Sequence, residues 1–166
     1  MTKSTFDNKE YRENLGFVLL FLVTFFVLQL LIGNAYIPSG SMEPTLTTGK
    51  SYMYLGCSYW FSDPKRGDII VFDDHGTVYC KRIIALPGET LDLFDGQVYI
   101  DGQLLDEPYA NGETYEGLNH LSHYEVPEGK YFFMGDNRLR SKDARSWDYE
   151  PFITKSQILG RIIKKN

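Results

Sequence analysis

The sequence is poor in cysteine and has no excess of positive charge. Its only cysteines, Cys57 and Cys80, are too few for a disulfide scaffold or a four-cysteine zinc site. The 17 basic and 22 acidic residues give a formal net charge of −5. Binding a phosphate backbone needs clustered positive charge, so we predict no nucleic-acid partner. A composition of 43% hydrophobic and 23% charged residues also excludes a disordered chain and a bundle of several membrane helices.

Long apolar runs are missing too, with one exception. Residues 15–33 read LGFVLLFLVTFFVLQLLIG and carry no charge. At about 1.5 Å of rise per residue, such a run just crosses a hydrocarbon core of about 30 Å. The alternative, a buried core helix, would need more protein around it than the remaining chain supplies. The run is longer than the apolar region of a cleaved signal peptide, and no small-x-small cleavage site follows it. We therefore predict an uncleaved transmembrane helix over residues 15–33.

The basic residues that flank this run predict its orientation. Lys3, Lys9 and Arg12 precede it, and the next basic residue is Lys50. The positive-inside rule then places residues 1–14 in the cytoplasm and residues 34–166 on the outer face of the cell membrane, as a single-pass protein. The adjacent aromatic residues 59–61 are a candidate for contact with the lipid bilayer, and core packing is the equal alternative.

The segment after the apolar run has the pattern of a single β domain. Runs rich in β-branched and aromatic residues occur at 67–72, 77–86, 97–100, 103–105 and 130–135. Asp95-Gly96 and Asp101-Gly102 are hairpin turn signals. We predict an antiparallel β sandwich or barrel, with a long polar loop over residues 106–126 and a short helix near residues 154–159.

The first chemical motif follows the apolar run directly. Residues 36–46 read YIPSGSMEPTL, where Ser39 and Ser41 flank Gly40, and Pro38 and Pro44 stiffen the backbone. A rigid loop that presents hydroxyl groups suits a serine nucleophile. A solvated linker between the apolar run and the domain is the alternative.

A serine nucleophile needs a base, and the histidines are poor candidates. His75 lies in a turn, while His120 and His123 lie in the polar loop without a third metal ligand nearby, so we predict no metal site. Lys81 lies within an apolar run on an expected internal strand. Burial there favours the neutral amine and lowers the pKa toward that of a general base. The alternative is a lysine whose stem packs while its ammonium group reaches water.

A third cluster spans residues 134–147. It alternates carboxylates, arginines and hydroxyls, with Asp136, Arg138, Asp143 and Arg145 beside many apolar residues. This density favours a hydrogen-bonded, ion-paired loop over a solvated turn.

Together these clusters resemble the type I signal peptidase family, Ser–Lys proteases that release exported proteins from their signal peptides. The resemblance rests on residues 39–45 (SGSMEPT), 67–72 (GDIIVF), 79–89 (YCKRIIALPGE) and 135–145 (GDNRLRSKDAR), in that order. A single anchor and a short chain resemble the Gram-positive members. The resemblance implies a mainly β catalytic domain behind the membrane helix. It also implies a serine endopeptidase that cleaves preproteins after Ala-x-Ala-type sites without a cofactor.

Carried over residue by residue, the resemblance assigns the catalytic roles. Ser41 is the expected nucleophile and Lys81 the general base. Ser39 and the backbone N–H of Ser41 would bind the oxyanion. Ser141 would orient the Lys81 amine by a hydrogen bond, with Tyr79 packed nearby.

The remaining roles are structural or concern the substrate. Asp143 and Arg145 would form a supporting ion pair, while Ile37, Pro38 and Cys80 would line shallow pockets for small side chains. Because Cys80 adjoins the expected base, we favour free thiols over a disulfide with Cys57.

Other functions stay open at this stage. The same fold could serve as a catalytically idle factor for pilin-type clients, or work with the secretion machinery. A self-cleaving repressor would need a DNA-binding region in place of the apolar segment, and a plain binding module leaves the lysine and the hydroxyls unexplained. The family often has Ser at position 144 and Gly at position 148, where this chain has Ala144 and Asp148.

Overall fold

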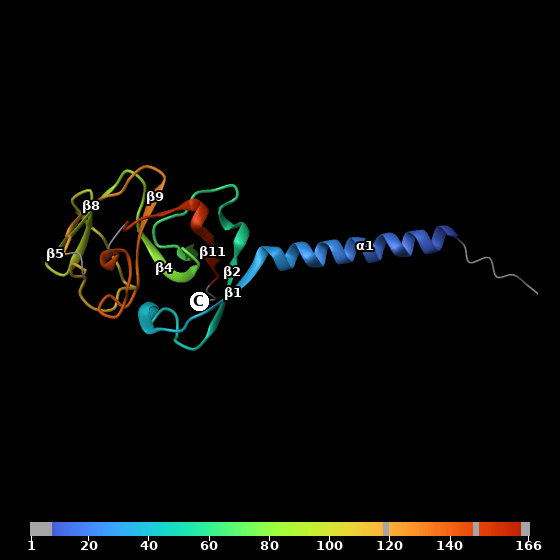
Figure 1. Cartoon of the computed structure of the whole chain (residues 1–166), viewed down its shortest axis with the longest axis horizontal. Coiled ribbons are helices and arrows are strands. Elements are labelled where there is room, and N and C mark those ends of the chain that lie inside the picture. Colours follow the sequence, from blue (N-terminus) through green and yellow to red (C-terminus); the bar gives the residue numbers. More distant parts are fainter. Residues whose placement is uncertain (1–7, 118–119, 148–149, 164–166) are drawn as a thin grey trace, which may run out of the picture.

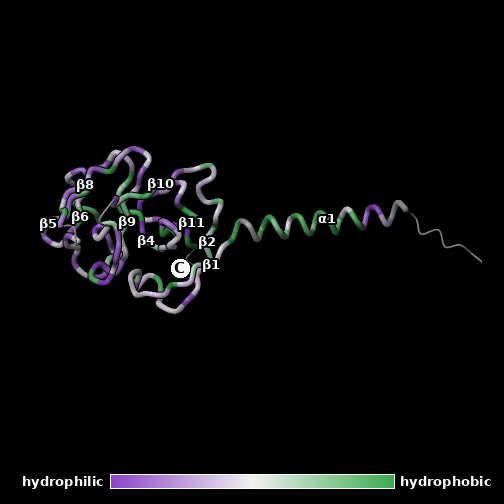
Figure 2. Tube along the Cα trace, in the orientation of Figure 1, coloured by the Kyte–Doolittle hydropathy of each residue, from purple (hydrophilic) through white to green (hydrophobic). Residues whose placement is uncertain are grey.

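The computed structural model describes residues 8–117, 120–147 and 150–163, and it shows a long helix that projects from a β domain (Figure 1). The helix α1 (Asn8–Leu31) has 24 residues, a length of about 36 Å at 1.5 Å per residue. The side chains of residues 11–28 are exposed, and the hydropathy colours of Figure 2 mark the helix as mostly hydrophobic. By length and composition, the segment Tyr11–Leu28 is able to cross a membrane.

The helix ends two residues before the end of the predicted apolar segment, because the chain enters a sheet. Strand β1 (Ile32–Tyr36) pairs antiparallel with β2 (Ser51–Leu55), and Gly33 lies opposite Tyr54. A Cβ atom on Gly33 would lie only 2.1 Å from the Tyr54 ring. Glycine therefore lets the Tyr54 ring cover the chain where it leaves the helix.

The domain consists of two antiparallel sheets, which confirms the predicted fold class. The seven-stranded sheet has the order β1-β2-β11-β3-β4-β9-β10, and the four-stranded sheet has the order β7-β6-β5-β8. The further strands of the large sheet are β3 (Ile69–Asp74), β4 (Thr77–Ala85), β9 (Lys130–Met134), β10 (Ile153–Thr154) and β11 (Ile158–Ile162). Those of the small sheet are β5 (Thr90–Phe94), β6 (Gln97–Ile100), β7 (Gln103–Leu104) and β8 (His123–Glu125).

The turn signals form the expected hairpins. Asp95 and Gly96 join β5 to β6, and Asp101 and Gly102 join β6 to β7, all four with positive φ. Two adjacent residues with positive φ form a turn whose twist matches that of the flanking strands.

Two local predictions need correction. The segment near residues 154–159 forms only the short 3₁₀ helix η4 (Lys155–Gln157) before β11 begins. The polar segment 106–126 is only partly exposed, since Thr114 is 3% and Tyr124 is 3% exposed. Arg138 donates a hydrogen bond to the Thr114 hydroxyl group, and Tyr124 lies on β8, which pairs with β5. Both partners are distant in sequence, so local composition does not show them.

Strand β3 separates two apolar clusters, which explains its unbroken apolar run. Ile70 and Phe72 belong to the larger cluster, whereas Ile69 and Val71 belong to the smaller one. Successive side chains of a strand point to opposite faces, so a strand covered on both faces loses the usual alternation. Its neighbour β4, which carries Lys81, lies between β3 and β9 and is also an internal strand.

Candidate active site

Ser41 and Lys81 meet in the domain interior. Ser41 lies in the 3₁₀ helix η1 (Gly40–Met42), which follows β1, and Lys81 lies on β4. The Lys81 Nζ atom is hydrogen-bonded to Ser41 Oγ at 2.8 Å, and the two residues are 4% and 6% exposed. The segment that carries Ser41 is therefore not a solvated linker. Lys81, in turn, is not a lysine whose ammonium group reaches water.

The environment of Lys81 favours its neutral amine. Burial lowers the pKa of Lys81 because a charged ammonium group loses its hydration, while the negative charge of Asp143 acts in the opposite direction. Ser41 supplies the only hydrogen bond to the Lys81 side chain among the described residues. A neutral amine beside a hydroxyl group is the arrangement that a general base requires.

The other two hydroxyl groups lie beside this pair. Ser39 Oγ is 3.5 Å from Ser41 Oγ. Ser141 Oγ is buried and makes no hydrogen bond within the described part of the chain. A Cβ atom on Gly135 would lie 2.2 Å from Ser141 Oγ and 2.4 Å from Ser41 O, so Ser141 reaches the site only across a glycine. Its expected hydrogen bond to Lys81 is absent here, and that role stays a prediction.

Four charged residues of the loop after β9 form buried ion pairs, namely Asp136, Arg138, Asp143 and Arg145. Arg145 donates from Nε and Nη2 to the two carboxylate oxygens of Asp143, both at 2.9 Å. Asp143 also accepts a hydrogen bond from the Gly135 backbone N–H at 3.0 Å, and Arg145 reaches the Arg138 carbonyl oxygen. Ala144 lies fully buried within η3 (Ala144–Ser146), while Asp148 lies outside the described residues. The expected Asp143–Arg145 pair is therefore present, and it shapes the loop beside Gly135.

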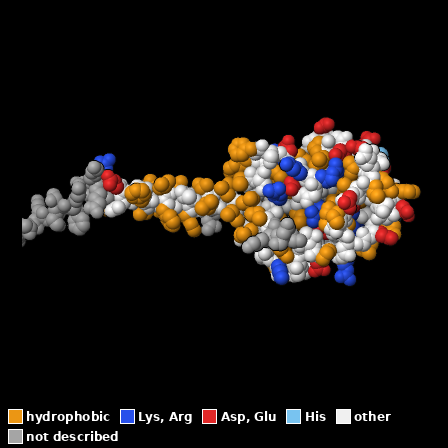
Figure 3. Space-filling model, turned by 180° about the vertical axis from the view of Figure 1, so that it is seen from behind, with side chains coloured by type: hydrophobic (Ala, Val, Ile, Leu, Met, Phe, Trp, Pro, Cys, Tyr) orange, Lys and Arg blue, Asp and Glu red, His pale blue; other side chains and the backbone are white. Residues whose placement is uncertain are grey.

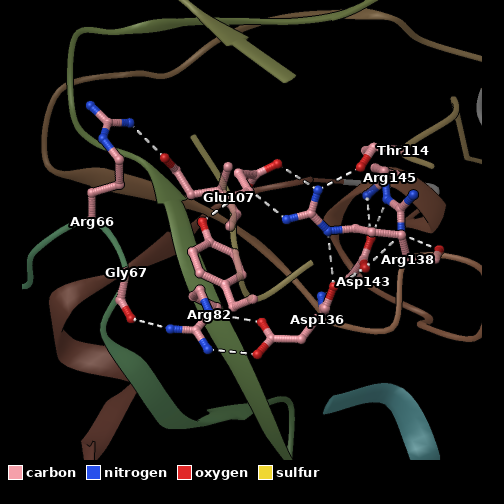
Figure 4. A network of polar contacts seen from close by, with 12 residues as sticks. Arg66, Gly67, Arg82, Glu107, Thr114, Asp136, Arg138, Asp143 and Arg145 are labelled. Atoms are coloured by element: carbon pink, nitrogen blue, oxygen red, sulfur yellow. Dashed lines mark hydrogen bonds and ion pairs between the residues drawn. The ribbon is translucent and has the colours of Figure 1, made fainter. Parts of the chain in front are cut away.

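A wider arginine network joins this loop to the rest of the domain (Figure 4). Arg82 binds both oxygens of Asp136, at 2.7 and 2.6 Å. Arg138 binds both oxygens of Glu107, at 2.8 and 2.6 Å, and also Thr114. Sequence reasoning placed Glu107 and Thr114 in a polar loop and gave Arg82 no role, because no local signal shows pairing across such distances.

An open cleft of about 670 Å³ contains the Ser–Lys pair. The three residues expected to line the substrate pockets, Ile37, Pro38 and Cys80, all line it. Tyr79, which was expected to pack near Lys81, lines it as well. The Tyr79 ring packs against Trp147, with centroids 5.6 Å apart.

The structure also bears on the predictions for the cysteines and histidines. Cys57 and Cys80 are both free thiols, and burial raises the pKa of Cys80 to about 12. His123 Nδ1 lies 2.6 Å from Asp92 Oδ1, so this histidine is not merely solvated. No cluster of metal ligands exists among the described residues.

Comparison with known proteins places the chain in a family. Residues 11–164 match the family model described as signal peptidase, peptidase S26. The chain belongs to this family. The probable signal peptidase I-1 of Synechocystis is 38% identical over 84% of this chain and 76% of its own length. Signal peptidase I S of Bacillus subtilis is 40% identical over 81% of this chain and 79% of its own length.

A solved structure gives a further match. The signal peptidase I of Enterococcus faecalis is 32% identical, covers 62% of this chain and 98% of its own, and superimposes with a TM-score of 0.49. As a member of the signal peptidase family, the chain is a serine endopeptidase.

Proposed function

We propose that Ser41 and Lys81 form a catalytic dyad that cleaves signal peptides from exported preproteins after small side chains. The observation that carries the proposal is the 2.8 Å contact between Lys81 Nζ and Ser41 Oγ inside an open cleft. No other described lysine lies within hydrogen-bond distance of a serine hydroxyl group.

The reaction needs one group that both takes and gives a proton. Ser41 Oγ attacks the scissile carbonyl carbon while the neutral Lys81 amine takes the hydroxyl proton. Collapse of the tetrahedral intermediate breaks the peptide bond, and the Lys81 ammonium group protonates the leaving amine. Lys81 then takes a proton from water as the water oxygen attacks the acyl-enzyme. It returns that proton to Ser41 Oγ when the ester bond breaks and the acyl product leaves as a carboxylic acid.

The developing oxyanion has two donors in this proposal. They are the Ser39 hydroxyl group, 3.5 Å from Ser41 Oγ, and the backbone N–H of Ser41. One such donor contributes about 2.7–4 kcal/mol to transition-state stabilisation in comparable sites. Ser39 is exposed at the cleft, so it is free to turn toward a bound carbonyl group.

The cleft suits an extended substrate with small side chains. Residues 34–39 and residues 77–81 both line it. An extended peptide laid between them pairs with backbone, and the pockets select its side chains. Ile37, Pro38 and Cys80 keep these pockets shallow, which favours Ala at the −1 and −3 positions.

The apolar helix and its surroundings suit attachment to a membrane, with residues 1–14 in the cytoplasm and the β domain outside. The 3₁₀ helix η2 (Gly56–Tyr59) contacts α1. Directly after it, Trp60 is 66% and Phe61 is 98% exposed. Figure 3 shows hydrophobic side chains gathered where α1 meets the domain. Exposed aromatic rings at such a place suit the lipid headgroup region, whereas Tyr59 of the same segment is buried.

The catalytic proposal is tested with purified full-length protein and a preprotein that carries an Ala-x-Ala site. Ser41→Ala and Lys81→Ala should each abolish cleavage, while the exposed Ser51→Ala and Lys50→Ala serve as matched controls. Wild-type cleavage by Ser41→Ala would refute the dyad. No cleavage by the wild type would favour an idle assembly factor for pilin-type clients.

The membrane contact has its own test. In vesicles containing brominated lipid, fluorescence of Trp60 should be quenched in a Trp147→Phe variant, and fluorescence of Trp147 should not be quenched in a Trp60→Phe variant. Equal quenching of both tryptophans would contradict the proposed contact.

A further inference from the structure

Asn137 connects the loop after β9 to the segment that carries the nucleophile. Its backbone N–H donates to the Ser41 carbonyl oxygen at 3.0 Å. Its side-chain Nδ2 donates to the Gly40 carbonyl oxygen, also at 3.0 Å and across 97 positions of sequence. Asn137 itself is only 8% exposed. The contacts thus fix two consecutive carbonyl groups at the nucleophile.

We propose that Asn137 is a positioning residue that holds Gly40 and Ser41 in the conformation from which Ser41 attacks. The inference rests on the proposed Ser–Lys dyad and adds a residue to which no role was assigned above. Asn137 does not touch the reacting atoms, and its effect passes through the backbone of the nucleophile segment.

The geometry of the peptide unit shows how a hydrogen bond to Gly40 affects the oxyanion. The Gly40 carbonyl group and the Ser41 N–H belong to one planar trans peptide unit and point in opposite directions. When Asn137 Nδ2 holds the Gly40 oxygen on one side, the Ser41 N–H is directed to the other side. That N–H is the backbone donor of the proposed oxyanion site, so Asn137 fixes its direction before substrate binds.

The residue before Asn137 fastens the same loop to the strand of the base. Asp136 is fully buried and binds Arg82 through both carboxylate oxygens. Arg82 directly follows Lys81 on β4. Residues 136 and 137 therefore join the strand that carries the base to the segment that carries the nucleophile.

The backbone around Asn137 is itself restrained. Asn111 N–H donates to the Asp136 carbonyl oxygen at 2.7 Å, and Arg138 N–H donates to the Asn111 carbonyl oxygen at 3.0 Å. On the other side, Gly135 lies against the Ser41 carbonyl group so closely that a Cβ atom would clash with it. A loop held on both sides transmits the position of Asn137 to Ser41.

The decisive variant is Asn137→Asp, which keeps the size of the side chain and replaces the donor by an acceptor facing the Gly40 oxygen. We expect kcat per folded enzyme to fall roughly 10–100-fold, since small displacements of reacting groups have effects of this size. KM should change little, because the pocket residues are untouched. Asn137→Gln, which restores an amide donor, should recover part of kcat. Asn111→Ala is the matched control. Among the described residues, Asn111 forms hydrogen bonds with this loop through backbone atoms alone, so the substitution should leave kcat unchanged.

Thermal unfolding of each variant separates positioning from folding. A fall in kcat with an unchanged folded fraction supports the proposal. Wild-type kcat in Asn137→Asp and Asn137→Ala, or a loss that merely follows the unfolded fraction, would overturn it. Failure of every variant to fold would likewise make Asn137 a folding residue. Ser41→Ala, assayed in parallel, tests the dyad separately: activity there would remove the proposed function, whatever Asn137 does.

Discussion

Lys81 and Arg82 are neighbours on β4 and both are buried, yet their side chains have different surroundings. Arg82 is held by both oxygens of Asp136, whereas Lys81 forms no ion pair within the described part of the chain and contacts Ser41. Consecutive residues of a strand project to opposite faces, so one strand serves two environments. The arginine side is a permanently charged scaffold, and the lysine side holds a group that can titrate.

The same contrast extends to the direction of the pKa shifts. Burial lowers the pKa of Lys81, and the carboxylate of Asp143 only partly offsets this. Burial alone would also lower the pKa of Arg138, but hydrogen bonds and the charge of Glu107 raise it above its usual value. Burial thus gives a proton acceptor where the partner is a hydroxyl group, and a fixed cation where the partner is a carboxylate.

Breaking the ion pair between Arg82 and Asp136 should have the largest effect on stability. Asp136→Ala leaves the Arg82 guanidinium buried without its partner, which we expect to lower the free energy of unfolding by about 3–5 kcal/mol. Urea unfolding of the full-length protein in detergent measures this loss. Adding Arg82→Met should recover much of the lost stability, since no unpaired charge then remains. Equal losses in the single and the double variant would contradict the role of the ion pair.

The lowered pKa of Lys81 should be visible in the pH dependence of activity. Below the pKa of Lys81, kcat/KM should rise about tenfold per pH unit, because only the neutral amine accepts the Ser41 proton. Asp143 raises the pKa of Lys81, so Asp143→Asn should move this limb to lower pH, by about one unit. Asp92→Asn, which alters a carboxylate on the small sheet, is the control. A limb that stays in place in Asp143→Asn would show that Asp143 does not act on the base.

Much of this contrast could be predicted from sequence on the lysine side and little on the arginine side. Lys81 stands in an apolar run, which indicates burial, and the flanking motifs resemble those of a protease family. The partners of Arg82 and Arg138 are 54 and 31 positions away, and no local pattern encodes such pairing. The contacts of Asn137 were not predicted for the same reason.

The fold shows the same division between local and long-range information. Turn pairs such as Asp101-Gly102 act within a few residues and predicted the hairpins correctly. The start of β1 at Ile32 was hidden, because its apolar residues continue the pattern of the helix and only pairing with β2 makes them a strand. Strand β11 was not predicted, because it contains a glycine, Gly160. That glycine fits against the Leu55 backbone, and sequence alone does not reveal this contact.

Removing the buried amine should stabilise the domain at the cost of activity. Lys81→Met replaces a group that prefers water, and we expect a gain of about 0.5–2 kcal/mol in the free energy of unfolding at neutral pH. The folded-state pKa of Lys81 is lowered, so between that value and the unfolded value the unfolded chain binds more protons. Wild-type stability therefore rises with pH across this window, and the advantage of Lys81→Met should shrink. An advantage that does not depend on pH would contradict the lowered pKa.

The smallest effect should come from an ion pair that is not buried. Lys155 Nζ lies 2.9 Å from Asp63, and the two side chains are 41% and 80% exposed. Exposed pairs contribute no more than about 1 kcal/mol because water and salt screen the charges. Lys155→Ala should therefore change urea unfolding far less than Asp136→Ala, and that small change should vanish in high salt. A loss comparable to that of Asp136→Ala would mean that burial does not decide the energetic weight of the ion pairs in this domain.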